Sequence, residues 1–88
     1  MTHQGARPDT VIDILGKAES YLKSRGCPSP RLDAGLLLAH VLKTDRVQLY
    51  VDHSRPLERG GLDSFRELAK RRAAREPVAY LIGSKEFW

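Results

Sequence analysis

Apolar residues recur at three-and-four spacing along most of the chain, a pattern typical of amphipathic helices. In the first such segment they run along one face from Val11 to Leu22. Asp9 or Thr10 can cap its start, and Gly26 is a typical residue just past a helix end. The sequence therefore predicts a first helix between this cap and this glycine.

The second segment is apolar around most of its circumference, as expected of a helix in the middle of a bundle. Ser29 and Pro30 are a typical helix start, because the hydroxyl can accept a first-turn amide hydrogen bond and proline lacks only an unneeded donor. The helix should end near Lys43. Asp33 and His40 form its polar stripe, and we expect His40 to be partly buried within the bundle. Its apolar residues are Leu32, Leu36, Leu37, Leu38, Ala39, Val41 and Leu42.

Three further segments complete the pattern. Thr44 or Asp45 can cap a short helix over residues 47–51. A fourth helix is predicted over residues 62–75, and a final helical turn over residues 78–82. The core face of the fourth helix consists of Leu62, Phe65, Leu68, Ala69 and Ala73.

These elements predict an all-α fold, a small bundle of four to five helices with the start of a β-hairpin linker at the carboxyl end. We interpret residues 1–8 as a flexible tail, residues 9–83 as the helical domain and residues 84–88 as the start of the linker. The linker interpretation depends on Phe87 and Trp88, because two such aromatic residues are typical of a strand that continues. We therefore expect the chain to be a piece of a longer protein.

The length and composition limit the chemistry that the chain can perform. Its 88 residues can form one modest core, but a nucleotide-binding α/β unit would need roughly 100 residues or more of its own. Neither a membrane span nor a signal peptide is evident, so we expect a cytoplasmic protein. Cys27, the only cysteine, excludes an internal disulfide and fits as a small apolar filler at a helix end. The three histidines are far apart in the sequence and suggest no metal site.

Positive charge is concentrated on the fourth predicted helix of a chain whose net charge is +4. Arg66 and Lys70 stack at four-residue spacing, as do Arg71 and Arg75. These four side chains are candidates for docking an acidic protein partner, and a solvated basic helix face is the simpler alternative. Nucleic acid is a less favoured ligand, because the start of this helix lacks the side chains that read bases.

Asp33 and Arg72 each interrupt the apolar surface of a predicted helix. A charged side chain is costly to bury without a partner, so we expect the two to form an ion pair. Such a pair would set the register between the second and fourth helices. The alternative is that both are unrelated exposed charges.

Two stretches of the sequence are distinctive. The first is RLDAGLLLAHVL, residues 31–42, followed by Asp45 and Arg46, and the second is RRAAREPVAYLIGSKEFW, residues 71–88. In order and spacing they resemble the first domain of the HemK/PrmC family of glutamine N5-methyltransferases and its junction with the catalytic domain. Gly35 departs from the family pattern, in which a longer or charged residue is usual.

The resemblance implies an enzyme that transfers a methyl group from S-adenosylmethionine to the glutamine amide nitrogen of the Gly-Gly-Gln motif in peptide chain release factors. The family's Asn-Pro-Pro-Tyr motif and the glycines around its cofactor are absent from these residues. We therefore assign no catalytic, cofactor-binding or metal residue here. The chain is expected to be inactive alone, to hold no cofactor and to help dock a class 1 release factor.

Two other functions fit the sequence less well. One is the first domain of the related methyltransferase that modifies a glutamine of a ribosomal protein, which shares the two-domain plan. The other is a stand-alone helical module that binds RNA through its basic helix.

Overall fold

The structure, a computed structural model, describes residues 9–83 and is all-α in this range, as predicted. Thr10 and Pro56 form an isolated bridge, but the described residues contain no β-sheet. The expected tail, residues 1–8, and the expected linker, residues 84–88, lie outside the described range. The five helices are α1 (Val11–Ser24), α2 (Pro30–Leu42), α3 (Arg46–Val51), α4 (Arg59–Ala73) and α5 (Val78–Leu81).

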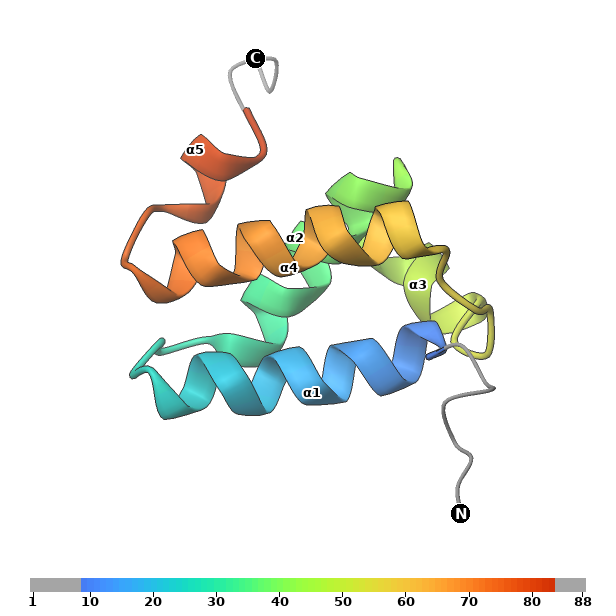
Figure 1. Ribbon diagram of the computed structural model, residues 1–88, viewed down its shortest axis with the longest axis horizontal. Coiled ribbons are helices and arrows are strands. Elements are labelled where there is room, and N and C mark those ends of the chain that lie inside the picture. The colour runs from blue at the N-terminus through green and yellow to red at the C-terminus, as the bar shows by residue number, and fades with distance from the viewer. Residues whose placement is uncertain (1–8, 84–88) are drawn as a thin grey trace.

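α2 is the central helix of the bundle. It contacts every other helix, and α1 and α4 lie side by side in front of it (Figure 1). Leu37 and Leu38 are fully buried, which agrees with the apolar circumference predicted for this segment. Leu32, near the amino end, is still 41% exposed, so α2 is not covered on all sides within the described residues.

The helix caps agree with the sequence at two of three predicted positions. Thr10 and Asp13 form a capping box at α1, and the Asp45 carboxylate accepts the Gln48 amide hydrogen at 2.9 Å at α3. α2 starts at Ser29 and Pro30 as predicted, but the Ser29 hydroxyl makes no cap hydrogen bond, so that part of the prediction was wrong. Thr10 and Asp45 have an extended backbone, which directs the side-chain oxygen back toward the first turn, whereas ψ of Ser29 is 64°.

α4 begins earlier than the sequence predicted. The helix starts at Arg59, so that Gly60 and Gly61 form its first turn and are not part of the preceding connection. A Cβ atom on Gly61 would lie 3.8 Å from a methyl group of Val41, an ordinary van der Waals contact with α2. Gly60 has no neighbour within 4 Å of such an atom, and the sequence pattern alone assigns both glycines to a turn.

His40 is exposed, and the prediction that it would be partly buried was wrong. It borders an open hollow between the carboxyl end of α2 and the start of α4. Gly60 and Gly61 line the same hollow and have no side chains with which to cover the imidazole. The polar stripe of α2 is therefore buried near the amino end of the helix, at Asp33, and exposed to solvent near the carboxyl end, at His40.

Candidate functional site

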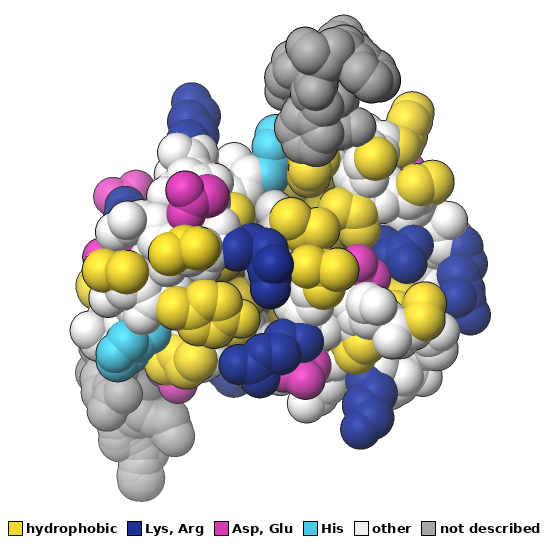
Figure 2. All heavy atoms as spheres, turned by 180° about the vertical axis from the view of Figure 1, so that it is seen from behind, with side chains coloured by type: hydrophobic (Ala, Val, Ile, Leu, Met, Phe, Trp, Pro, Cys, Tyr) yellow, Lys and Arg dark blue, Asp and Glu magenta, His cyan; other side chains and the backbone are white. Residues whose placement is uncertain are grey.

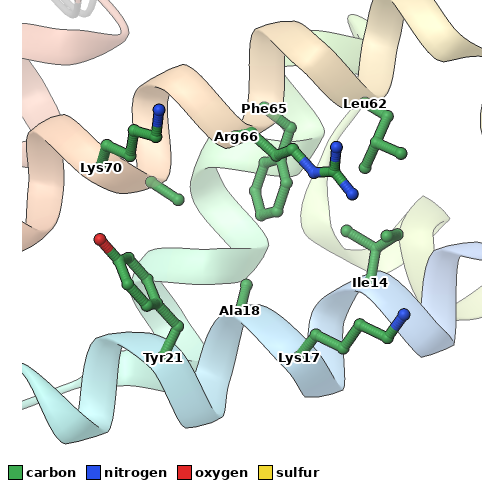
Figure 3. A pocket seen from close by; sticks show the side chains of 9 residues that line it. Ile14, Lys17, Ala18, Tyr21, Leu62, Phe65, Arg66 and Lys70 are labelled. Carbon is green, nitrogen blue, oxygen red and sulfur yellow. The ribbon is translucent and has the colours of Figure 1, made fainter.

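The four candidate docking residues of α4 do not form one surface. Arg66 and Lys70 are exposed and line a groove between α1 and α4 (Figure 3). Arg71 and Arg75 do not line it. Arg71 lies in the last turn of α4, Arg75 lies beyond the end of the helix, and both donate hydrogen bonds to groups within the domain. The structure therefore divides the predicted cluster into two groove residues and two residues that hydrogen-bond within the domain.

The groove has an apolar floor and a basic rim. Its volume is about 260 Å³, and its floor includes the ring of Phe65, which is only 2% exposed, and the small side chains of Ala18 and Ala69. Lys17 from α1 lies across the recess from Arg66 of α4, and Lys70 of α4 lies opposite Tyr21 at the other end (Figure 3). The residues that line it are Ile14, Lys17, Ala18, Tyr21, Leu62, Phe65, Arg66, Ala69 and Lys70, which include no carboxylate.

Lys17 is a groove residue that the sequence reasoning missed. Its spacing from Asp13 is typical of an ordinary solvated pair on a helix surface, which gives no reason to single it out. In the structure its ammonium group lies 3.1 Å from the Asp9 carboxylate, and the lysine side chain is largely exposed. The available signal was its position beside Ile14 and Ala18, on the edge of the buried face of α1.

Arg71 holds the end of α4 to the segment that follows it. Its guanidinium donates hydrogen bonds to both carboxylate oxygens of Glu76, the shortest at 2.8 Å, and lies 6.0 Å from the centre of the Tyr80 ring. The hydrogen bond and the charge of Glu76 raise the pKa of Arg71 above its usual value. This arginine is already neutralised, so it is a weaker docking candidate than Arg66 or Lys70.

Arg75 covers the turn between α1 and α2. Its guanidinium donates to the Gly26 carbonyl oxygen at 3.4 Å, and a Cβ atom on Gly26 would lie only 3.0 Å from that guanidinium. Gly26 has a φ of 84°, a conformation that favours glycine. The cationic end of Arg75 is thus directed at a backbone turn and away from the groove.

Asp33 and Arg72 are brought together. Arg72 Nε lies 2.9 Å from Asp33 Oδ2, and the side chains are only 16% and 9% exposed for the arginine and the aspartate. Arg72 also donates to the Glu76 carbonyl oxygen at 3.1 Å. One guanidinium therefore links α2, α4 and the start of the turn into α5.

The junction of α2 with α3 has an unusual arginine. Gly35 is buried, and a Cβ atom there would lie 3.1 Å from Nε of Arg46, whose side chain fills the space that a larger residue would occupy. That Nε atom is buried and has no hydrogen-bond acceptor among the described residues. The glycine that departs from the family pattern thus makes room for Arg46 but provides no partner for it.

The remaining candidate residues offer no catalytic constellation within residues 9–83. Cys27 is buried at the end of α1, as expected for an apolar filler. The described residues contain no group of three or more side chains suited to hold a metal ion. None of the helices within residues 9–83 is long and apolar enough to cross a bilayer.

The fold and the groove define the chain as a small all-α domain with an open recess rimmed by cations. The model of the PrmC N-terminal domain family matches residues 13–83, and the chain belongs to this family. The resemblance found in the sequence is thereby confirmed.

Similar curated proteins bear the name release factor glutamine methyltransferase. Those of Leptospira interrogans and Rhodopirellula baltica are each 40% identical over 92% of this chain, and that of Vibrio cholerae is 42% identical over 90%. The chain spans only 28%, 27% and 28% of the length of these relatives, respectively. No solved structure matches it significantly.

Proposed function

We propose that the chain is the amino-terminal domain of a release factor glutamine methyltransferase and that it docks the release factor. The family match over residues 13–83 carries this proposal, supported by the names of the relatives. In the whole enzyme, the methyl group would pass from S-adenosylmethionine to the glutamine amide nitrogen of the Gly-Gly-Gln motif. The cofactor and the catalytic groups would belong to the part of the enzyme outside these residues.

A separate docking domain suits this chemistry. An amide nitrogen is a poor nucleophile because its lone pair is delocalised into the carbonyl group, so the reaction depends on holding it in line with the sulfonium methyl group. Contacts far from the reacting atoms can supply the binding energy for that positioning. A domain that grips the release factor beside the methylated loop would provide such contacts without a catalytic residue of its own.

The side chains available for docking are those that are exposed and not already paired within the domain. Arg66 and Lys70 meet this condition, whereas Arg71 and Arg75 are hydrogen-bonded to Glu76 and Gly26. We therefore place the release factor on the side of α4 that faces α1.

The docking role can be tested by comparing two substrates. The full-length enzyme and a version that lacks residues 1–83 would be assayed with a whole class 1 release factor and with a short peptide that contains Gly-Gly-Gln. We expect loss of the domain to raise KM for the whole factor and to leave kcat/KM for the peptide nearly unchanged, because the peptide is too short to reach the domain. An unchanged KM for the whole factor would contradict docking.

Parallel assays address the other two functions. Methylation of a ribosomal protein in preference to the release factor would identify the related enzyme as the correct assignment. RNA binding by the 88-residue chain that weakens steeply with salt would favour the nucleic-acid alternative.

A further inference from the structure

We infer that the groove between α1 and α4 binds an acidic amphipathic helix of the partner protein, with an apolar side chain on the groove floor and carboxylates against its rim. The inference rests on the proposed docking function and specifies the surface and the ligand chemistry. It involves Lys17 of α1 as well as Arg66 and Lys70 of α4.

The floor of the groove suits a single large apolar side chain. Ala18 and Ala69 are the small residues at its base, and the Phe65 ring closes it from below (Figure 3). Both alanines are almost fully buried, and their side chains are single methyl groups. The base of the recess is therefore apolar, and it leaves space for a side chain of the ligand. A recess of about 260 Å³ can accept a leucine or phenylalanine side chain, the kind of anchor that commonly dominates protein recognition.

The charges on the rim select an acidic ligand. The three cations come from both sides of the recess, and its lining residues include no acidic side chain that could neutralise them in place. At the rim, Lys17 forms an ion pair with Asp9, whose side chain is 31% exposed. Arg66 and Lys70 form no ion pair within residues 9–83, so both are available to an incoming carboxylate, which favours association and orients the ligand.

The arrangement of the helices favours a helical ligand. α1 and α4 lie side by side with α2 behind them, so that the groove runs between two helices (Figure 1). A third helix can pack into such a groove with its apolar face inward and its polar flanks over the two walls. The carboxylates on those flanks would then face Lys17 on one wall and Arg66 and Lys70 on the other.

Other exposed apolar groups lack this combination. Val47 and Val51 on α3 are exposed at four-residue spacing, but they lie on the surface of a short helix and line none of the recesses described. Figure 2 shows the side of the molecule away from the groove, where basic and acidic side chains are interspersed among the hydrophobic ones. An apolar recess with charges of one sign is therefore the feature that identifies the α1–α4 groove.

The first test is charge reversal at the rim. Lys17→Glu, Arg66→Glu and Lys70→Glu would be made singly in the 88-residue chain and in the full-length enzyme. Lys23→Glu is the matched control, because Lys23 changes the net charge equally but lies on the opposite side of α1. Affinity for a class 1 release factor would be measured by calorimetry for the chain and through KM for the enzyme.

We expect each rim variant to bind the release factor about tenfold more weakly, and the control to bind within about twofold of the wild type. Circular dichroism would verify that every variant is folded. If the wild type binds and all three rim variants match Lys23→Glu, the groove inference is wrong while docking stands. If the wild-type 88-residue chain does not bind the release factor and removal of residues 1–83 does not raise KM, the proposed function itself fails.

The second test identifies the segment that is bound. A benzophenone photocrosslinker would be attached to Lys70→Cys, and for comparison to Lys23→Cys, in a Cys27→Ala background that removes the native thiol. We expect the label at position 70 to capture a release factor peptide that is helical and acidic with an apolar face. Capture of a basic or extended segment, or equal capture from position 23, would overturn the inference.

Discussion

Replacement of Arg72 by Ala should destabilise the domain more than any other change to a basic residue of α4. The substitution leaves the Asp33 carboxylate, in a side chain that is 9% exposed, without its ion-pair partner. It also removes the hydrogen bond to the Glu76 carbonyl oxygen. Breaking a fully buried pair costs about 3–5 kcal/mol, and the residual exposure of this pair lowers the expected loss to about 2–4 kcal/mol.

This loss is large for a small domain. A chain of this size typically has an unfolding free energy on the order of 4–13 kcal/mol, so Arg72→Ala should remove a substantial part of it. Urea denaturation followed by far-ultraviolet circular dichroism would measure the change. Arg66→Ala is the control on the same helix, and because Arg66 is exposed, its effect should stay within about 0.5 kcal/mol.

A double-mutant cycle separates the ion pair from the lost packing of the arginine stem. With Asp33→Ala added, the domain no longer contains an unpaired buried carboxylate, so the double variant should be more stable than the sum of the two single losses predicts. We expect a coupling energy of about 1–3 kcal/mol. A loss below about 0.5 kcal/mol for Arg72→Ala, or a coupling near zero, would refute the argument that this pair joins α2 to α4.

The same denaturation assay checks three further predictions. Thr10→Ala should lower the unfolding free energy by about 1 kcal/mol through loss of the capping box, whereas Ser29→Ala, which removes no cap bond, should change little; equal losses would refute this. Gly16→Ala should raise the unfolding free energy by about 0.5–1 kcal/mol, since the new Cβ atom would meet nothing within 4 Å, whereas Gly26→Ala, at a φ of 84°, should lower it. A lower unfolding free energy for Gly16→Ala would contradict this prediction. Arg46→Met removes an unpartnered buried Nε, so it should leave the unfolding free energy unchanged or raise it by up to about 1 kcal/mol. A decrease of more than about 1 kcal/mol would show that the guanidinium has a partner.

Elements with a local cause were predictable from the sequence. The apolar circumference of α2 indicated a central helix, and the caps Thr10 and Asp45 were each one of two predicted candidates, because these features depend on residues within one or two turns. Even local signals had limits. Ser29 has the residue type of a cap but not the backbone conformation, and Gly60 and Gly61 have the composition of a turn but lie in a helix.

The candidate site was only partly predictable. The pattern of α4 identified Arg66 and Lys70, but it gave equal weight to Arg71 and Arg75, whose partners come from segments that the helix itself does not specify. Lys17 was not found, since it belongs to the other wall of the groove. A surface made by two helices cannot be read from the periodicity of either one.

By itself, the sequence determined the all-α class, the order of the helices and the family, because helical periodicity, caps and distinctive stretches are properties of neighbouring residues. Only the tertiary structure decided between the alternatives that the sequence left open for the charged side chains. The ion pair of Arg72 with Asp33, 39 positions away, was expected but had an open alternative, and the approach of Lys17 to the wall that carries Arg66 was not expected at all. The physical reason is that the packing of α1 and α4 against α2 sets the direction in which each side chain points, and this packing depends on all three helices together.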